Sequence, residues 1–169
     1  MNNELYQTEP LNDNPIEIPS YNNDTANLIE QVHELNGVKY CFALKGNSIE
    51  QTISALNTFS QRIILITGGN DENMSYDSLA DTLVSKVKHL ILLGQTSGII
   101  EVCLMQKLVG KFQGIDIRIT HCSNLKQAVD CAYLSAKTGD FVLLAPASNC
   151  TSGNYEELKE IFNKYVTRL

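Results

Sequence analysis

Hydrophobic and polar residues alternate in blocks from about residue 27 to the end of the chain, and each block has the length of one strand or one helix. Short runs of branched apolar residues, several of them ended by glycine, are typical of buried strands in a parallel sheet. They predict strands at Val38–Phe42, Ile63–Thr67, His89–Leu93, Ile115–Thr120 and Phe141–Ala145. The run from Ile115 alternates apolar with polar residues, so we expect it at an edge of the sheet.

Apolar residues recur at helical spacing between and after these strands. They predict amphipathic helices at Ser48–Phe59, Ser75–Val87, Ile99–Lys111, Asn124–Thr138 and Tyr155–Leu169. Ser48 suits the N-cap of the first helix, and Gly139 suits the C-terminal end of the fourth. Five residues of the fourth helix are expected to face the core: Leu125, Val129, Ala132, Tyr133 and Ala136.

The strand starts are evenly spaced, because Ile63, His89, Ile115 and Phe141 follow one another at intervals of 26 residues. This is the length of one strand–helix unit, and such units wind with right-handed crossovers. The sequence therefore predicts an α/β fold with a doubly wound, mainly parallel sheet and helices on both faces.

The chain of 169 residues is long enough for one domain and a tail. Residues 1–26 are rich in Asn, Asp, Glu and Pro, which predicts a flexible arm or linker before a domain at 27–169. The net charge is −6, and no cluster of Lys or Arg indicates nucleic acid or an anionic membrane surface as a partner. No apolar run reaches the ~18–20 residues of a membrane span, and no signal peptide is recognisable, so we expect a cytoplasmic protein.

Polar residues gather after the apolar strands, where ligands of α/β proteins usually bind. The candidate loops are Ala43–Asn47, Thr67–Asn73, Gly94–Gly98 and Ala145–Gly153. With Lys45, glycine N–H groups and small hydroxyls, they would suit an anionic ligand such as a carboxylate or phosphate. Other roles stay open: Gly68 and Gly69 for chain reversal alone, Lys45 as a solvated lysine, and Asp71 as a cap of its own loop or of the next helix.

Known catalytic patterns are absent from the sequence. Residues 67–73 read TGGNDEN and match neither GxxxxGK[ST] nor GxGxxG, so no nucleotide motif is present. The three histidines have no Ser or Cys partner, and no carboxylate pair indicates acid–base chemistry. The five cysteines form no CxxC pair, which predicts reduced thiols and no metal site. The residues alone predict no catalytic group.

Longer segments carry a resemblance to a known family. In chain order they are ELNGVKY (34–40), IILITGGND (63–71), HLILLG (89–94), AVDCAYLSAKTGDFVLLAPAS (128–148) and EELKEIF (156–162). Together they resemble the C-terminal domain of the Mur ligases, and among these the domain of the D-glutamate-adding enzymes. The resemblance covers residues 27–169 and implies a Rossmann-like sheet of about six strands, one of them antiparallel.

The resemblance also implies a role in peptidoglycan synthesis. Full-length ligases join an amino acid to a nucleotide-linked sugar peptide through an acyl phosphate made with ATP. Their C-terminal domain binds the amino acid and closes over ATP held by a central domain, so ATP and Mg²⁺ belong to the full-length enzyme. The expected partners of this chain are then the N-terminal and central domains that it lacks, and D-glutamate.

Lys45, Asp71 and Ser148 are the positions that the resemblance assigns to substrate binding. Around them the chain departs from the family, which usually has a lysine for the amino-acid carboxylate where this chain has Glu72. The loop at 149–154, NCTSGN, is also shorter than the family loop. Two hypotheses follow. The chain is an amino-acid-binding ligase domain that is inactive alone; alternatively, it is a degenerate stand-alone module that binds without catalysis.

Overall fold

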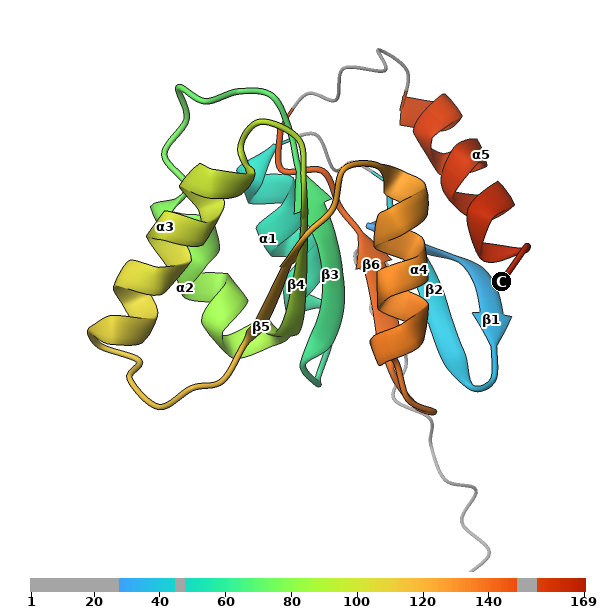
Figure 1. Cartoon of the computed structure of the whole chain (residues 1–169), viewed down its shortest axis with the longest axis horizontal. Helices are drawn as coiled ribbons and strands as arrows, with labels where there is room; N and C mark the ends of the chain where they lie inside the picture. The colour runs from blue at the N-terminus through green and yellow to red at the C-terminus, as the bar shows by residue number, and fades with distance from the viewer. Residues whose placement is uncertain (1–27, 45–47, 149–154) are drawn as a thin grey trace, which may run out of the picture.

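The structure is a computed structural model that describes residues 28–44, 48–148 and 155–169. These residues form one six-stranded sheet in the order β1-β2-β6-β3-β4-β5 (Figure 1). The strands are β1 (Ile29–Leu35), β2 (Val38–Ala43), β3 (Ile63–Gly68), β4 (Val87–Leu93), β5 (Arg118–His121) and β6 (Phe141–Leu144). β1 pairs antiparallel with β2, and the other neighbours pair in parallel. The predicted fold class is confirmed.

Helices cover both faces of the sheet. They are α1 (Ile49–Asn57), α2 (Asp77–Lys86), α3 (Ser97–Val109), α4 (Leu125–Ser135) and α5 (Tyr155–Val166). The first three lie on one face, and α4 and α5 lie on the other (Figure 1). Ser48 caps α1 as predicted, because its Oγ accepts a hydrogen bond from the Gln51 N–H at 3.3 Å.

The strand β3 shows why its apolar run is continuous. Ile63 and Leu65 point into the core under α1, α2 and α3, whereas Ile64 and Ile66 point into the core under α4 and α5. All four side chains are fully buried. A central parallel strand with helices on both faces needs apolar residues at every position. This places the carboxyl end of β3 at the middle of the molecule.

The strand β1 is not among those that the apolar runs predict. Its sequence, IEQVHEL, mixes polar and apolar residues because it lies at an edge and is only partly buried. Asn36 and Gly37, with φ of +53° and +75°, make the turn into β2. Such a two-residue hairpin turn favours Asn-Gly, so the Asn36-Gly37 dipeptide is the sequence feature that could have predicted the hairpin of β1 and β2.

Several predicted element ends were wrong. The helix α4 ends at Ser135 rather than Thr138, and Gly139 turns the chain toward β6, with its N–H donating to the Gly37 carbonyl oxygen. On α4, Tyr133 is exposed whereas Ala128 is buried. The edge position of β5 is confirmed, although β5 begins at Arg118. In the part of the chain that is described, no helix is long and apolar enough to cross a membrane.

Candidate functional site

Two glycines build the loop that follows β3. A Cβ at Gly68, whose φ is +148°, would lie 1.7 Å from the Leu93 carbonyl oxygen of β4. A Cβ at Gly69 would lie 1.9 Å from Ser148 Oγ, just beyond β6. Gly68 therefore requires glycine, because the contact is with backbone, and a side chain at Gly69 would force Ser148 to move. The pair therefore serves the close approach of three chain segments, and not chain reversal alone.

Ser148 holds this loop in place. The backbone N–H groups of Asn70 and Asp71 donate to Ser148 Oγ at 3.1 and 3.3 Å. The serine is buried, and its oxygen satisfies two part-buried backbone donors. Tyr76 also holds the loop, because its hydroxyl donates a hydrogen bond to the Asp71 carbonyl oxygen at 2.7 Å. Two of the predicted site residues, Asp71 and Ser148, are thus brought together.

The carboxylate of Asp71 acts within its own loop. Its Oδ1 accepts a hydrogen bond from the Asn73 N–H at 3.0 Å, which is one of the roles left open by the sequence. The neighbouring Glu72 is exposed. Lys45, the third predicted site residue, lies outside the described residues. The structure therefore groups Asp71 with Ser148 and leaves the lysine unplaced.

The ends of the neighbouring strands are tied to this loop. Thr67 Oγ1 donates to the Ala145 carbonyl oxygen at 2.6 Å, which joins β3 to β6. The Thr96 N–H donates to the Gly69 carbonyl oxygen at 3.1 Å, which joins the loop after β4. The helix α1 is tied to the segment after β6 as well, because Thr52 Oγ1 donates a hydrogen bond to the Pro146 carbonyl oxygen at 3.0 Å. The predicted convergence of the loops after β3, β4 and β6 is confirmed for their described parts.

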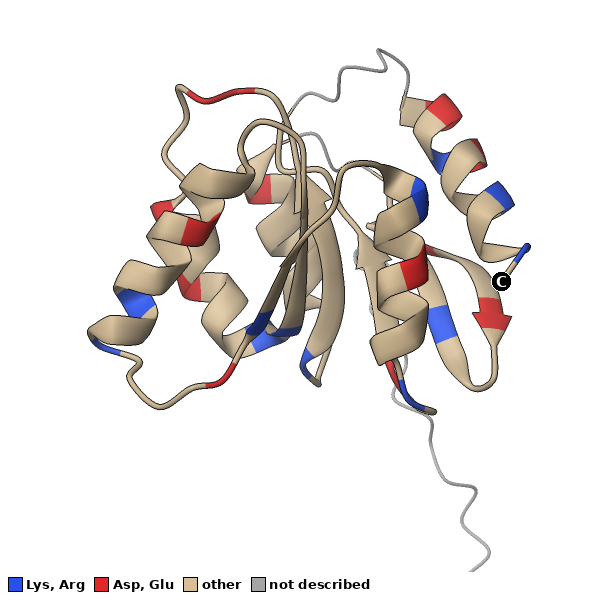
Figure 2. Ribbon diagram, in the orientation of Figure 1, with Lys and Arg blue, Asp and Glu red and all other residues tan. Residues whose placement is uncertain are grey.

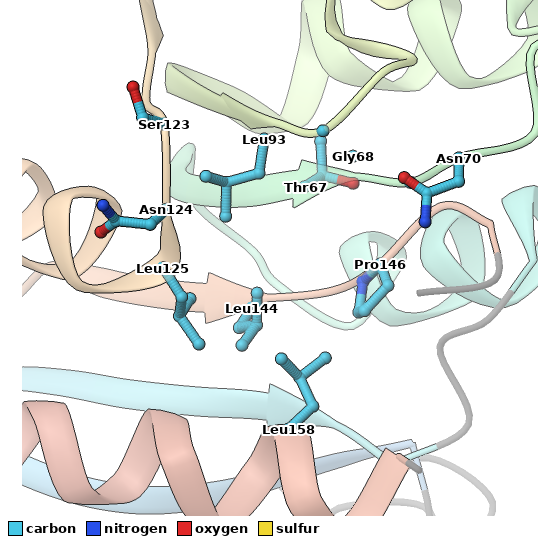
Figure 3. A pocket seen from close by; sticks show the side chains of 12 residues that line it. Thr67, Gly68, Asn70, Leu93, Ser123, Asn124, Leu125, Leu144, Pro146 and Leu158 are labelled. Carbon is cyan, nitrogen blue, oxygen red and sulfur yellow. The ribbon is translucent and has the colours of Figure 1, made fainter. Parts of the chain in front are cut away.

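A cavity of about 240 Å³ opens at this edge, on the side of α4 and α5 (Figure 3). It lies between β3, whose chain leaves toward α2 on one face, and β6, whose chain leaves toward α5 on the other. This divergence is the switch point at which ligands of α/β sheets bind. The cavity is lined by Thr67, Gly68, Gly69, Asn70, Leu93, Gly94, Ser123, Asn124, Leu125, Leu144, Pro146 and Leu158.

The segment Ser123–Leu125 and Leu158 of α5 were not among the predicted site residues. Asn124 caps α4, since its Oδ1 accepts from the Gln127 N–H at 2.9 Å, while Gln127 Oε1 accepts from the Ser123 N–H at 2.8 Å. This reciprocal pairing is a known start of a helix. The helical pattern of the sequence correctly predicted that a helix starts at Asn124. Only the order of the strands in the sheet shows that this helix, α4, begins beside the end of β3.

The described lining of the cavity carries no ionisable side chain. Acidic residues occur in the loop after β3 and in the first turn of α5 (Figure 2). The residues concerned are Asp71, Glu72, Glu156 and Glu157. The described lining of the cavity is therefore neutral.

The described residues of this edge show no metal-binding cluster, and the cavity is small. No group of three or more His, Cys, Asp or Glu side chains among them could hold a metal ion. The cavity is also smaller than the roughly 300–1,000 Å³ of pockets for drug-sized ligands. The described cysteines are free thiols, and burial raises the pKa of Cys41 to about 11, which makes it unreactive.

Comparison with known proteins gives this site a family context. A sequence model described as "Mur ligase, glutamate ligase domain" matches residues 27–148. The chain belongs to the Mur ligase family. The predicted family resemblance is thereby confirmed, and the chain contains a Mur ligase C-terminal domain with this cavity at the carboxyl edge of its sheet.

Two relatives of this Mur ligase domain are UDP-N-acetylmuramoylalanine–D-glutamate ligases. The one from Ruminiclostridium cellulolyticum is 37% identical over 154 residues, which are 90% of this chain and 33% of the relative. The one from Acetivibrio thermocellus is 42% identical over 143 residues, 83% of this chain and 31% of the relative. The chain thus spans about a third of the length of these curated relatives.

Solved structures support the fold of the Mur ligase domain. The murein peptide ligase Mpl from Psychrobacter arcticus matches with a TM-score of 0.55 and 13% identity over 85% of this chain and 30% of its own. The folylpolyglutamate synthase from Mycobacterium tuberculosis, complexed with ADP, matches with a TM-score of 0.54 and 12% identity over 79% of this chain and 31% of its own. At these identities the likeness concerns the fold alone.

Proposed function

We propose that this chain is the amino-acid-binding domain of a D-glutamate-adding type of Mur ligase. The observation that carries the proposal is the cavity at the switch point, whose wall is the Gly68–Asp71 loop held by Ser148. Its volume suits an amino acid better than a nucleotide. Lys45, Asp71 and Ser148 are the residues that we assign to this site, with Asp71 and Ser148 shaping the loop rather than touching the substrate.

The remaining parts of the reaction belong to the other domains of the ligase. The relatives are about three times as long as this chain, and one structural neighbour was solved with ADP. We assign ATP, Mg²⁺ and the nucleotide-linked sugar peptide to domains outside this chain, which are its expected partners. Residues 1–26 would serve as the linker to them, and 27–169 as the domain itself.

Two measurements test this proposal. The purified chain, mixed with ATP, Mg²⁺, UDP-N-acetylmuramoyl-L-alanine and D-glutamate, is expected to release no ADP. In a titration followed by NMR, amino acids should shift the amide signals of Thr67, Asn70 and Asn124, whereas ATP with Mg²⁺ should not. Ligation by the chain alone would overturn the assignment of the chemistry to other domains. Amino-acid shifts confined to other regions would overturn the site.

A second candidate function is a non-catalytic binding module. Glu72 favours it, because a carboxylate in the loop after β3 would repel the anionic substrate that a lysine there would attract. The two candidates differ when the missing domains are supplied. A central and N-terminal domain from one of the relatives, added in trans or fused before residue 27, should restore ligation only if this chain is a working ligase domain.

A further inference from the structure

We propose that Cys122 and Cys131 form a redox-active pair of thiols, which closes to a disulfide and thereby moves one wall of the cavity. The wall concerned is the segment from Ser123 to Leu125, which follows Cys122 directly in the chain. The inference goes beyond the proposed function, because it assigns a site of reversible oxidation, and it holds whichever ligand the cavity takes.

The position of Cys122 is fixed by the sheet. Its N–H donates to the Leu92 carbonyl oxygen at 2.9 Å, so its backbone extends the pairing of β5 with β4 by one residue. Side chains alternate between the two faces along a strand, so Cys122 points to the same face as Thr120. Thr120 faces α4, because the ring of His89 lies 2.9 Å from Thr120 Oγ1 and 2.8 Å from Ser135 Oγ of α4. Cys122 therefore faces α4.

The position of Cys131 follows from the direction of α4. This helix starts at the carboxyl edge of the sheet, just after β5, and runs back across the sheet (Figure 1). Cys131 lies one turn before Ser135, which is about 6 Å nearer that edge on the same side of the helix. Cys122 lies about 7 Å nearer the edge than Thr120. The two steps are nearly equal, and the bridge through His89 sets their starting points opposite each other. Cys131 therefore lies opposite Cys122.

The two thiols are in contact. A hydrogen bond joins the thiol of Cys122 to that of Cys131. Both are partly exposed free thiols, and both pack against the core under α4 and α5. Cys103 is also partly exposed, but it packs against the core on the other face of the sheet. Among the described cysteines, Cys122 and Cys131 are therefore the pair placed to form a disulfide.

Oxidation of this pair uses a low-molecular-weight disulfide as the oxidant. A thiolate of the pair attacks one sulfur of that disulfide, which forms a mixed disulfide and releases one small thiol. The second cysteine then attacks the protein sulfur of the mixed disulfide, and the second small thiol leaves. The protein loses two electrons to the oxidant, and the two protons of its thiols end on the released thiols. Burial, together with the neighbouring Cys131 thiol, raises the pKa of Cys122, so the reaction requires an excess of oxidant.

Closure of the disulfide changes the wall of the cavity. A disulfide brings two sulfur atoms closer together than a hydrogen bond between thiols does. Cys122 must therefore move toward α4, and Ser123 and Asn124 follow it directly. Both of these residues line the cavity (Figure 3). Asn124 also caps α4 through the Gln127 N–H at 2.9 Å, so the start of the helix is coupled to the same movement.

Oxidation of the full chain by glutathione disulfide tests the pairing, because trypsin separates the two cysteines. Cleavage after Lys126 places Cys122 in the peptide 119–126 and Cys131 in the peptide 127–137. After the remaining thiols are blocked, mass spectrometry should find these two peptides linked, with two hydrogen atoms fewer than their sum. Dithiothreitol should separate them. Absence of the link, or a link from either cysteine to a different one, would overturn the pairing.

Two variants sharpen this test. Cys131→Ser removes one partner, so glutathione should stay attached to Cys122 as a mixed disulfide. Cys103→Ser is the matched control, because it changes a partly exposed thiol on the other face, and it should form the link as the parent chain does. Loss of the link in both variants would contradict the pairing. If Cys131→Ser does not fold, Cys122→Ser should instead leave glutathione on Cys131.

NMR spectra of the reduced and oxidised chain test the effect on the cavity. The amide signals of Ser123, Asn124 and Leu125 should shift on oxidation and return after dithiothreitol. The amide signals of α1, on the other face of the sheet, should stay in place. Unchanged signals of the three wall residues in the cross-linked chain would overturn the coupling between the thiol pair and the cavity.

Discussion

The loop after β3 has two halves that differ in what constrains them. Gly68 and Gly69 are buried and meet the backbone of β4 and the side chain of Ser148 at distances that leave no room for a Cβ. Asp71 is half-buried and Glu72 is exposed, only two and three residues further along the chain. Steric exclusion acts on the first half, whereas solvent surrounds most of the second.

The difference separates shape from charge at this site. A change in the glycine half disturbs three strand ends at once, because the loops after β3, β4 and β6 meet there. A change at Glu72 alters the local charge and little else, since an exposed side chain seldom contributes more than about 0.5 kcal/mol to stability. The architecture of the loop can therefore be kept while the charge at residue 72 changes.

Among changes in the glycine half of the loop, Gly68→Ala should destabilise the protein most. The added Cβ would overlap the Leu93 carbonyl oxygen, and φ is unfavourable for alanine. We expect a loss of more than about 3 kcal/mol in the free energy of unfolding, or no folded protein at all. Urea denaturation followed by circular dichroism measures it. Gly98→Ala, at the start of α3 with nothing within 4 Å of its Cβ, is the matched control and should lose no stability.

A pH titration probes His89, a buried histidine that lies between α4 and the sheet. Its Nδ1 is 2.8 Å from Ser135 Oγ and its Nε2 is 2.9 Å from Thr120 Oγ1. The Ser135 hydroxyl donates to the Ala132 carbonyl oxygen, so a neutral ring donates to Ser135 and accepts from Thr120. Burial, helped by Arg118, lowers the pKa of His89 to about 4.

The folded state disfavours the protonated ring of His89. The contribution of the neutral ring to stability is therefore complete above about pH 6.5 and declines as the pH falls toward 4. The decline should reach up to about 3 kcal/mol. Urea unfolding at pH 7.5 and pH 4.5 should show it in the parent chain and in His121→Gln, whose histidine is exposed. The pH dependence should be smaller in His89→Gln. An unchanged dependence in that variant would remove His89 as the cause.

Ser148→Ala should have an intermediate effect. It removes the oxygen that accepts from the Asn70 and Asp71 N–H groups, and it leaves two part-buried donors without this acceptor. The expected loss is about 1–3 kcal/mol in the free energy of unfolding, with faster hydrogen exchange at the amides of Asn70 and Asp71. Ser123→Ala is the control at an exposed serine on the opposite wall of the cavity. Equal exchange rates at these amides in parent and variant would show that the serine does not hold the loop.

Glu72→Lys should change stability least, by no more than about 0.5 kcal/mol, because the side chain is exposed. Its effect should appear in binding. A cation in this loop should strengthen D-glutamate binding several-fold, and 0.5 M salt should weaken that gain. Glu160→Lys makes the same charge change on the exposed side of α5 and should leave binding unchanged. Identical affinities for the two variants would mean that Glu72 does not face the ligand.

The sequence predicted the layered architecture well, because continuous apolar runs such as Ile63–Ile66 and the even spacing of strand–helix units are direct consequences of a parallel sheet covered on both faces. It predicted β1 poorly. Edge strands are half solvated, so IEQVHEL carries too little apolar periodicity to stand out. It also placed Tyr133 inside, because helical spacing alone does not say which side of a broad apolar face meets the sheet.

The sequence by itself determined the fold class, the candidate loops and the acidic character of the loop at Asp71 and Glu72, since these depend on local pattern and residue type. Only the tertiary structure decided the order β1-β2-β6-β3-β4-β5, which brings Ser148 under the Gly69–Asp71 loop from 77 residues away. The same order sets Leu125, Leu144 and Leu158 around one hollow. Neither of these two arrangements follows from residue spacing along the chain, because each depends on which strands lie side by side in the sheet.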